Sequence, residues 1–199
     1  MRVIAGTYRS RILKSLKGLA LRPTSDRLRE TLFNVLTPNI AGARFVDLFA
    51  GTGAIGIEAL SRGAADVVFI ENHPPAAILI RRNLESLGVN TGATVLAVDA
   101  LRGLAMLASR KKQVEPGFDY VFLDPPYAAA EDYSRVLEFL GFADLLVPRA
   151  IVVAEHRRNF DLCEEAGILR RFRVLRQGDA ALSFYRHRGD AGAENDSAE

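Results

Sequence analysis

The 199-residue sequence is poor in the features that mark several common classes of protein. It has one cysteine, Cys163, so no internal disulfide can form, and no Cys/His cluster has the spacing of a zinc site. The first residues lack the apolar stretch of a signal peptide, and no apolar run approaches the roughly 18 residues of a membrane span. We therefore expect a cytoplasmic protein without a metal or a membrane segment, working as a monomer.

Acidic residues are missing from one part of the chain. Residues 1–25 contain none, although they carry six basic side chains: Arg2, Arg9, Arg11, Lys14, Lys17 and Arg22. The whole chain has a net charge of +2, so residues 26–199 carry −4. Short apolar runs on either side of Gly6 predict a hairpin or arm in the basic segment. A segment that carries only basic charges indicates either a polyanion-binding surface or a face exposed to solvent, and charge alone does not distinguish these two interpretations.

A helix is predicted after the basic segment. Residues 24–26 supply capping side chains, and the helix should end before Pro38. Apolar residues recur on one face of this helix: Leu28, Leu32, Val35 and Leu36. Arg27 and Arg29 fall off that face, so we predict that both point toward solvent or a ligand.

From residue 45 onward, short apolar runs alternate with helical segments. The runs predict strands at 45–49, 67–70, 94–98, 120–123 and 151–154, and the segments between them predict helices at 54–62, 75–87, 101–109 and 131–139. This alternation is typical of a parallel, doubly wound α/β sheet. Residues 172–175 and 182–185 flank a turn at Gly178, which predicts a hairpin with an antiparallel last strand. The predicted organisation is a basic arm at 1–25, an α/β domain at 26–188 and an acidic, disordered tail at 189–199.

A glycine loop follows the first of these strands, between Asp47 and Gly56. Gly51 and Gly53 let the backbone turn sharply and approach a ligand, and Glu71 ends the next strand, where a carboxylate can accept from two ribose hydroxyls. This unit indicates an adenosine-containing cofactor, and both NAD and S-adenosylmethionine (SAM) meet that description. Asp47 favours SAM, because a carboxylate beside the loop would repel a pyrophosphate and suits an ammonium group. Asp99, after the third strand, is a candidate acceptor for an adenine amine or a helix cap.

The fourth strand ends in Asp124-Pro125-Pro126-Tyr127. The carboxyl ends of parallel strands face one crevice, so this turn should lie beside the glycine loop. Asp124 and the Pro125 carbonyl can accept the two hydrogens of a planar substrate's NH₂ group while Tyr127 stacks on its ring. Such an arrangement would aim the nitrogen lone pair at a methyl donor, and an anionic Asp124 would stabilise the positive charge that develops on nitrogen.

These motifs resemble those of class I SAM-dependent methyltransferases with a [DN]PPY sequence. More narrowly, the sequence resembles the bacterial family that methylates the N2 amine of one guanine in 16S ribosomal RNA. The narrow resemblance rests on Arg2–Gly6, on Arg9-Ser10-Arg11 and on residues 22–34, which read RPT-x-DR-x-RE-x-LFN. It covers about residues 1–186. Ser10 departs from the family pattern, which more often has glycine there.

The resemblance implies a Rossmann-like, seven-stranded sheet with an antiparallel last strand and a small basic hairpin. It implies SAM as the cofactor, with contacts at Asp47, Phe49, Gly51, Gly53, Glu71, Asn72, Asp99 and Ala100. Residues 124–127 would hold the guanine, which must leave its stack to reach them. The partner would be 16S rRNA or the assembling 30S subunit, with phosphate contacts from the arm and the first helix. The candidates for these contacts are Arg2, Arg9, Arg11, Arg22, Arg27 and Arg29.

Three alternatives stay open at this point. The [DN]PPY motif also serves DNA adenine-N6 and protein glutamine methyltransferases, although the segment at 22–34 favours rRNA. A nicotinamide oxidoreductase could use the same glycine loop and Glu71, but it has no use for Asp124 or Tyr127. The protein could also be a non-catalytic RNA-binding assembly factor that has a methyltransferase scaffold. An activity assay would distinguish such a factor from an enzyme.

Overall fold

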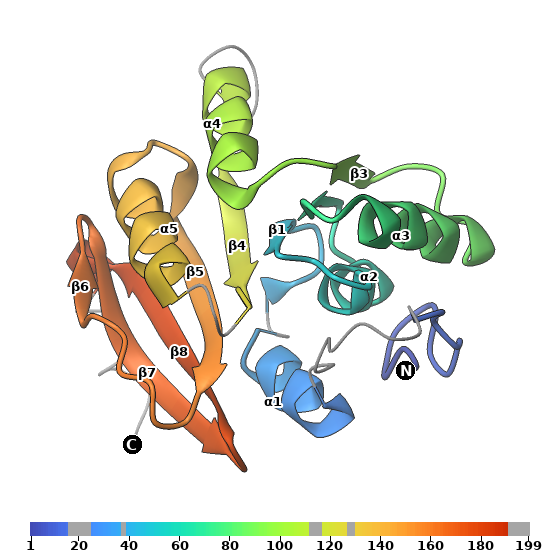
Figure 1. Ribbon diagram of the computed structural model, residues 1–199, viewed down its shortest axis with the longest axis horizontal. Helices are drawn as coiled ribbons and strands as arrows, with labels where there is room; N and C mark the ends of the chain where they lie inside the picture. Colours follow the sequence, from blue (N-terminus) through green and yellow to red (C-terminus); the bar gives the residue numbers. More distant parts are fainter. Residues whose placement is uncertain (16–24, 37–38, 112–116, 127–129, 191–199) are drawn as a thin grey trace.

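The computed structural model describes residues 1–15, 25–36, 39–111, 117–126 and 130–190 (Figure 1). Its helices are α1 (Asp26–Leu36), α2 (Ala54–Ser61), α3 (Pro74–Ser86), α4 (Ala100–Lys111) and α5 (Ala130–Phe142). Its strands are β1 (Arg44–Leu48), β2 (Asp66–Ile70), β3 (Ala93–Leu96), β4 (Phe118–Leu123), β5 (Leu146–Arg157), β6 (Glu165–Ala166), β7 (Leu169–Gln177) and β8 (Ala180–His187). A short 3₁₀ helix, η2, spans Arg188–Asp190. No helix in the described ranges is long and apolar enough to cross a membrane.

The strands form one mixed sheet in the order β3-β2-β1-β4-β5-β8-β7-β6. Strands β1 to β5 are parallel, and β8 runs antiparallel to both β5 and β7, which confirms the predicted α/β architecture with its antiparallel last strand. The expected number of seven strands was too low by one. The additional strand, β6, has two residues and pairs only with the start of β7, so it leaves almost no periodic signal in the sequence.

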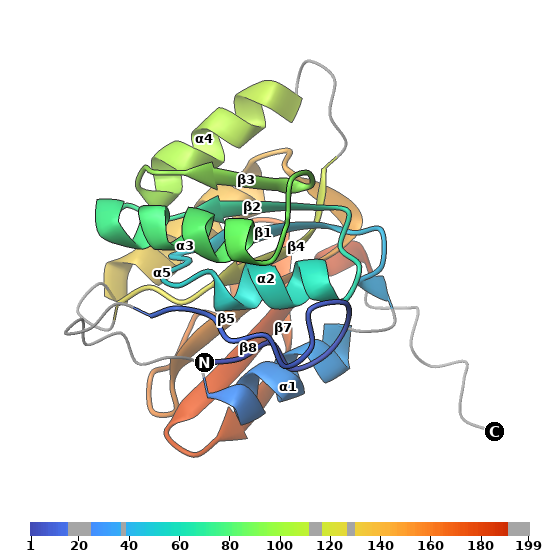
Figure 2. The same cartoon turned by 90° about the vertical axis from the view of Figure 1, so that its right-hand side faces the viewer.

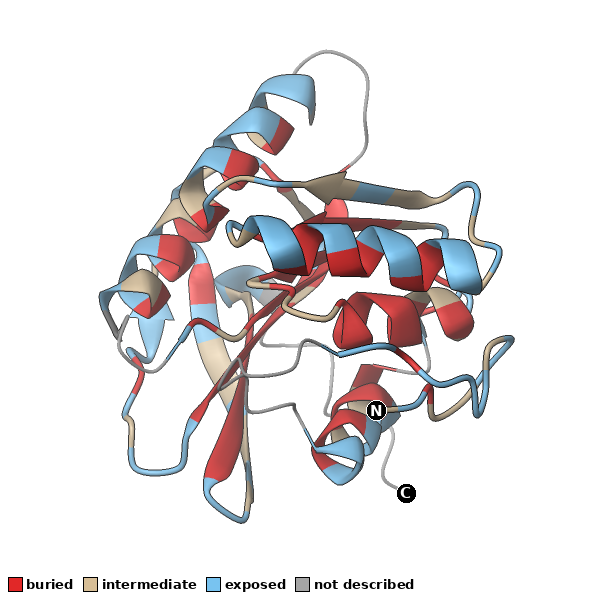
Figure 3. Cartoon of the chain, turned by 45° about the vertical axis from the view of Figure 1, so that its right-hand side comes forward, coloured by how far each residue is buried: buried red, intermediate tan, exposed pale blue. Residues whose placement is uncertain are grey.

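Helices cover both faces of the sheet (Figure 1). One core joins α1, α2 and α3 to one face, and a second core joins α4 and α5 to the other. The central strands are therefore buried on both faces, and α2 is buried almost throughout (Figure 3). This double burial explains why β1, β2 and β4 read as continuous apolar runs rather than as alternating ones.

The basic N-terminal segment begins as a hairpin that is docked on the domain. Arg2 and Ile12 form an antiparallel bridge, and the hairpin lies between α1 and α2 (Figure 2). Val3 and Leu13 are each 2% exposed and belong to the same core as the helices of that face. The division of the chain at residue 25 stays a prediction, and the acidic stretch from residue 191 lies outside the described residues.

The turn of this hairpin depends on two unusual backbone conformations. Gly6 has φ +81°, and a Cβ there would lie 1.7 Å from the carbonyl oxygen of Ser61, so only glycine fits. Ser10 has φ 67°, in the left-handed region that disfavours residues with a side chain. Ser10 therefore occupies a conformation that suits glycine, which gives a physical reason for the glycine that the family more often has there.

Candidate active site

The glycine loop connects β1 to α2 at the carboxyl edge of the sheet. Gly51 and Gly53 have φ 55° and 77°, so both adopt the left-handed conformation that the sharp turn requires. A Cβ on Gly56 would lie 2.3 Å from the ring of Phe69, so this third glycine allows α2 to pack against β2. A Cβ on Gly51 would meet nothing closer than the Phe49 carbonyl oxygen at 3.9 Å. The space above Gly51 is therefore open to a ligand.

Asp47 lies beneath this loop, with its side chain 1% exposed. Its Oδ2 accepts a hydrogen bond from the amide of Gly56, the third residue of α2, at 2.9 Å. Because the N-cap residue Gly53 has no side chain, Asp47 caps the helix from the neighbouring strand. Burial raises the pKa of Asp47 to about 8, the Gly56 amide opposes this shift, and the charge of Glu71 adds to it. Direct contact of Asp47 with a ligand ammonium stays a prediction.

Glu71 joins the loop to α3. Its Oε2 accepts from the Gly51 amide at 2.7 Å, and its Oε1 accepts from the His73 amide at 2.8 Å, at the start of α3. The side chain is 8% exposed. A carboxylate offers about four lone-pair positions, so two hydrogen bonds to the backbone leave acceptor capacity for ribose hydroxyls. The structure therefore brings Glu71 to the glycine loop, as the spacing in the sequence predicted.

The other candidate cofactor residues lie at the same edge, on three connections. Phe49 follows β1 with φ 59°, a strained conformation for an aromatic residue, and Asn72 is exposed directly after Glu71. Asp99 is exposed, and its Oδ1 accepts from the Arg102 amide at 2.9 Å, which makes it the N-cap of α4, where Ala100 is the first residue. Asp99 thus has the capping function that the sequence allowed, and its contact with an adenine amine stays a prediction.

The Asp-Pro-Pro turn lies directly beside the glycine loop. Leu48 of β1 pairs with Leu123 of β4, so Phe49 and Asp124 leave neighbouring strands at the same level, about 4.8 Å apart across the ladder. Asp124 is half-buried, Pro125 is buried and Pro126 is exposed. Tyr127 lies outside the described residues, so its stacking function stays a prediction. The geometry places a carboxylate and a rigid turn next to the open space above the loop.

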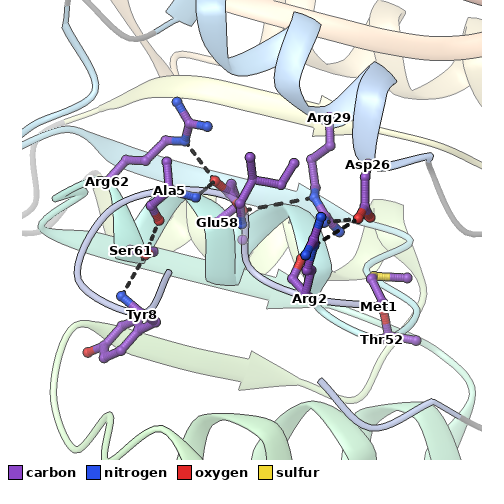
Figure 4. Close-up of polar contacts among 12 residues, drawn as sticks. Met1, Arg2, Ala5, Tyr8, Asp26, Arg29, Thr52, Glu58, Ser61 and Arg62 are labelled. Carbon is purple, nitrogen blue, oxygen red and sulfur yellow. Dashed lines mark hydrogen bonds and ion pairs between the residues drawn. The ribbon is translucent and has the colours of Figure 1, made fainter. Parts of the chain in front are cut away.

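Arg29 does not face solvent, which corrects the prediction from the helical pattern. Its side chain is 0% exposed, and its Nη2 donates to the Arg2 carbonyl and to Asp26 Oδ1 (Figure 4). The N-terminal hairpin covers the face of α1 that the apolar pattern left for water. Burial lowers the pKa of Arg29, and the charges of Glu58 and Asp26 oppose this shift. A side chain enclosed in this way cannot contact an RNA phosphate.

Glu58 is the partner that sequence reasoning missed. It is 0% exposed on α2, and its carboxylate lies 3.9 Å from Arg29 Nε and 2.8 Å from Arg62 Nε (Figure 4). It also accepts from the amides of Ile4 and Ala5 in the hairpin, at 2.8 and 3.0 Å. The signal in the sequence was a single carboxylate within the apolar helix AIGIEALS. Glu58 thus ties the hairpin, α1 and α2 together.

The remaining arginine candidates are distributed over the hairpin and α1. Arg2 lies 3.7 Å from Asp26, Arg11 donates to the carbonyl of Ser86, and Arg9 and Arg27 are exposed. Arg22 lies outside the described residues. Within the described ranges, no group of three or more His, Cys, Asp or Glu side chains could hold a metal ion.

Comparisons with known proteins agree with these motifs. The family model described as Conserved hypothetical protein 95 matches residues 1–186. The chain is 43% identical over 162 residues to the ribosomal RNA small subunit methyltransferase D of Haemophilus influenzae, covering 80% of each protein. It is 38% identical over 189 residues to YlbH of Bacillus subtilis, named as a candidate rRNA methyltransferase, covering 95% of this chain and 100% of that protein.

A solved structure from Escherichia coli, named yhhF and described as a candidate methyltransferase, superimposes with a TM-score of 0.81. It is 31% identical to this chain, and the match covers 94% of this chain and 97% of that one. The sequence match, the shared fold and the glycine loop beside Asp124 all agree with the family that the sequence resembles. The chain therefore belongs to the Conserved hypothetical protein 95 family, and small subunit rRNA methyltransferases D are among its relatives.

Proposed function

We propose that this protein transfers a methyl group from SAM to the N2 amine of a guanine in small-subunit ribosomal RNA. The observation that carries the proposal is the register of β1 and β4, which sets Asp124 beside the glycine loop. A carboxylate at that place is within reach of an amine that lies over the loop. The names of the relatives support rRNA as the substrate class.

The residues of the crevice fit the proposed cofactor. Gly51 leaves space above the loop, and Glu71 has acceptor capacity for the ribose. SAM, when bound, supplies an electrophilic methyl group on a sulfonium, and the sulfur keeps the electrons of the broken C–S bond. We expect a direct transfer in which the nitrogen forms the new C–N bond and then loses one of its protons to water.

Asp124 has two functions in this proposal. It accepts an N–H of the base amine, which orients the lone pair, and its negative charge stabilises the nitrogen as it becomes positive. The rigid Pro125 carbonyl accepts the second N–H, and Tyr127 stacks on the base. Glu71 and the loop hold the cofactor and take no part in proton transfer.

The test is transfer of a labelled methyl group from SAM to small-subunit rRNA that lacks the modification, followed by nucleoside analysis. We expect N2-methylguanosine. Asp124→Ala should lower kcat by about 10²-fold or more. The kcat of Asp124→Asn should lie between those of Asp124→Ala and the wild type, because the hydrogen-bond acceptor stays while the charge is lost. SAM binding by calorimetry should be unchanged in both variants. A methylated adenine, a labelled protein, or wild-type turnover in Asp124→Ala would contradict the proposal.

A further inference from the structure

Exposed arginines gather where the outer strands end at the active-site edge. Arg157 ends β5 and pairs with Ala180, which also pairs with Gln177 at the end of β7. The Arg158 amide donates to the carbonyl of Asp179, so the end of β5 is joined to the turn between β7 and β8. Arg157, Arg158 and Arg176 are all exposed. The ends of β5 and β7 therefore present three cations around one turn.

This cluster lies close to Asp124. Leu123 pairs with Ala154, so Asp124 is level with residue 155 and Arg157 is two residues further, about 7 Å along the strand. Strand β7 is three strands from β4, which is about 14 Å across the sheet. Phosphates flanking a base held at Asp124 would pass over this region.

The charge at the two ends of these strands differs. At the far end, Arg170 and Arg188 pair with Glu165, and Arg171 pairs with Asp161 and Glu164. These acids compensate the cations there. At the active-site end, Asp179 is the acidic residue within the turn that joins the strands. The cluster at the active-site end is therefore the more positive of the two.

The turn of the N-terminal hairpin, in contrast, lies away from the active-site edge. The Thr7 amide donates to the carbonyl of Ser61, the last residue of α2, and Arg11 donates to the carbonyl of Ser86, the last residue of α3. Helix α2 starts at the active-site edge and runs away from it, and its 8 residues correspond to about 12 Å of helix. Helix α3 instead passes beside the glycine loop, where Asn83 donates to the carbonyl of Thr52. The turn of the hairpin, which carries Arg9, is therefore at the wrong end for phosphates next to the target base.

We propose that Arg158 and Arg176, together with Arg157, form an RNA-phosphate surface that flanks the active site. This surface, rather than the turn of the N-terminal hairpin, holds the RNA strand next to the methylated base. The inference rests on the proposed function in taking RNA as the substrate. It adds the place where the RNA backbone crosses the protein.

The experiment compares two double variants of the full chain. Arg158→Ala/Arg176→Ala removes two cations at the active-site ends of β5 and β7. Arg149→Ala/Arg170→Ala removes two exposed cations near the other ends of the same strands and serves as the matched control. Affinity for single-stranded rRNA fragments is measured across a salt series, and SAM binding is measured by calorimetry.

RNA affinity falls as the salt concentration rises, and the salt slope is the loss of log affinity per tenfold rise in salt. Each lost phosphate contact on single-stranded RNA lowers this slope by roughly 0.7 log units. Two lost contacts lower it by about 1.4, so over a fourfold rise in salt the wild type should lose about sevenfold more affinity than Arg158→Ala/Arg176→Ala. The control should keep the wild-type slope, and both variants should bind SAM normally. Equal slopes in wild type and both variants would overturn this inference while leaving the proposed function intact. A wild-type protein that binds SAM and no RNA would instead contradict the function.

Discussion

The buried ion pair between Arg29 and Glu58 predicts an unequal response to removing its two members. Glu58→Gln removes the charge that faces Arg29 and keeps a side chain of the same size. It leaves an arginine with 0% exposure next to a neutral amide, and among the described residues Arg29 Nε and Nη1 have no hydrogen-bond partner even in the native protein. Removing one partner of a buried pair costs about 3–5 kcal/mol. The melting temperature should therefore fall by roughly 6–20 °C.

The double variant separates charge from packing. Arg29→Met/Glu58→Gln removes the cation that Glu58→Gln leaves without its buried partner and fills its place with an apolar side chain. The double variant should therefore be more stable than Glu58→Gln alone, because no buried charge is left without its partner on α2. Arg27→Met, on the exposed side of the same helix, should change stability by about 0.5 kcal/mol or less.

Urea denaturation of Arg29→Met, of the three variants above and of the wild type measures these differences. The reasoning would be refuted if the double variant lost the sum of the two single losses, because the two charges would then not interact. It would also be refuted if Arg29→Met left stability unchanged and lowered RNA affinity. That outcome would return Arg29 to the surface function that the helical pattern first indicated.

Three further changes have expected outcomes. Glu71→Ala should weaken SAM binding in calorimetry by about 1–3 kcal/mol, because charge-assisted hydrogen bonds are lost; unchanged affinity would exclude Glu71 from the cofactor site. Ser10→Gly should raise the free energy of unfolding by up to about 1 kcal/mol by removing left-handed strain, and Gly42→Ala, at φ +77° in open space, should lower it similarly. Burial raises the pKa of Asp47 to about 8, so its contribution to stability is complete below about pH 4 and is lost as pH rises through 8. Asp47→Asn should flatten that fall in urea denaturation between about pH 4 and pH 8.

The parts of the fold that could be predicted are those with a local cause. The predicted helix after Ser25 is observed as Asp26–Leu36, and the Ser25 hydroxyl accepts from the Leu28 amide at 3.1 Å, as the capping pattern indicated. The strands that precede the glycine loop and Asp124 also lie where their apolar runs predicted. Because the carboxyl ends of parallel strands share one edge, the meeting of Glu71, Asp124 and the loop followed from chain order.

The parts that could not be predicted depend on contacts between distant segments. Whether Arg29 faces water depends on a hairpin that is held by Glu58, which is 54 residues from Ile4. The helical pattern shows which face of α1 is apolar, but it does not show that a second layer covers the polar side. Likewise, Asp47 lies beside the loop in sequence, yet its hydrogen bond to Gly56 turns it inward as a cap.

The same reasoning changes how the basic N-terminal segment should be understood. Six cations in 25 residues suggested one continuous RNA anchor, but two of the cations that the structure describes have partners on different helices. Arg2 lies 3.7 Å from Asp26 on α1, whereas Arg11 donates to the carbonyl of Ser86 on α3. A local excess of charge in the sequence therefore need not form a single surface. Arg158 and Arg176 show the opposite case, because they are 18 residues apart in the sequence and the pairing of β5, β8 and β7 brings their strand ends together. Under the proposed function, charge that converges through strand pairing would follow an RNA backbone past Asp124.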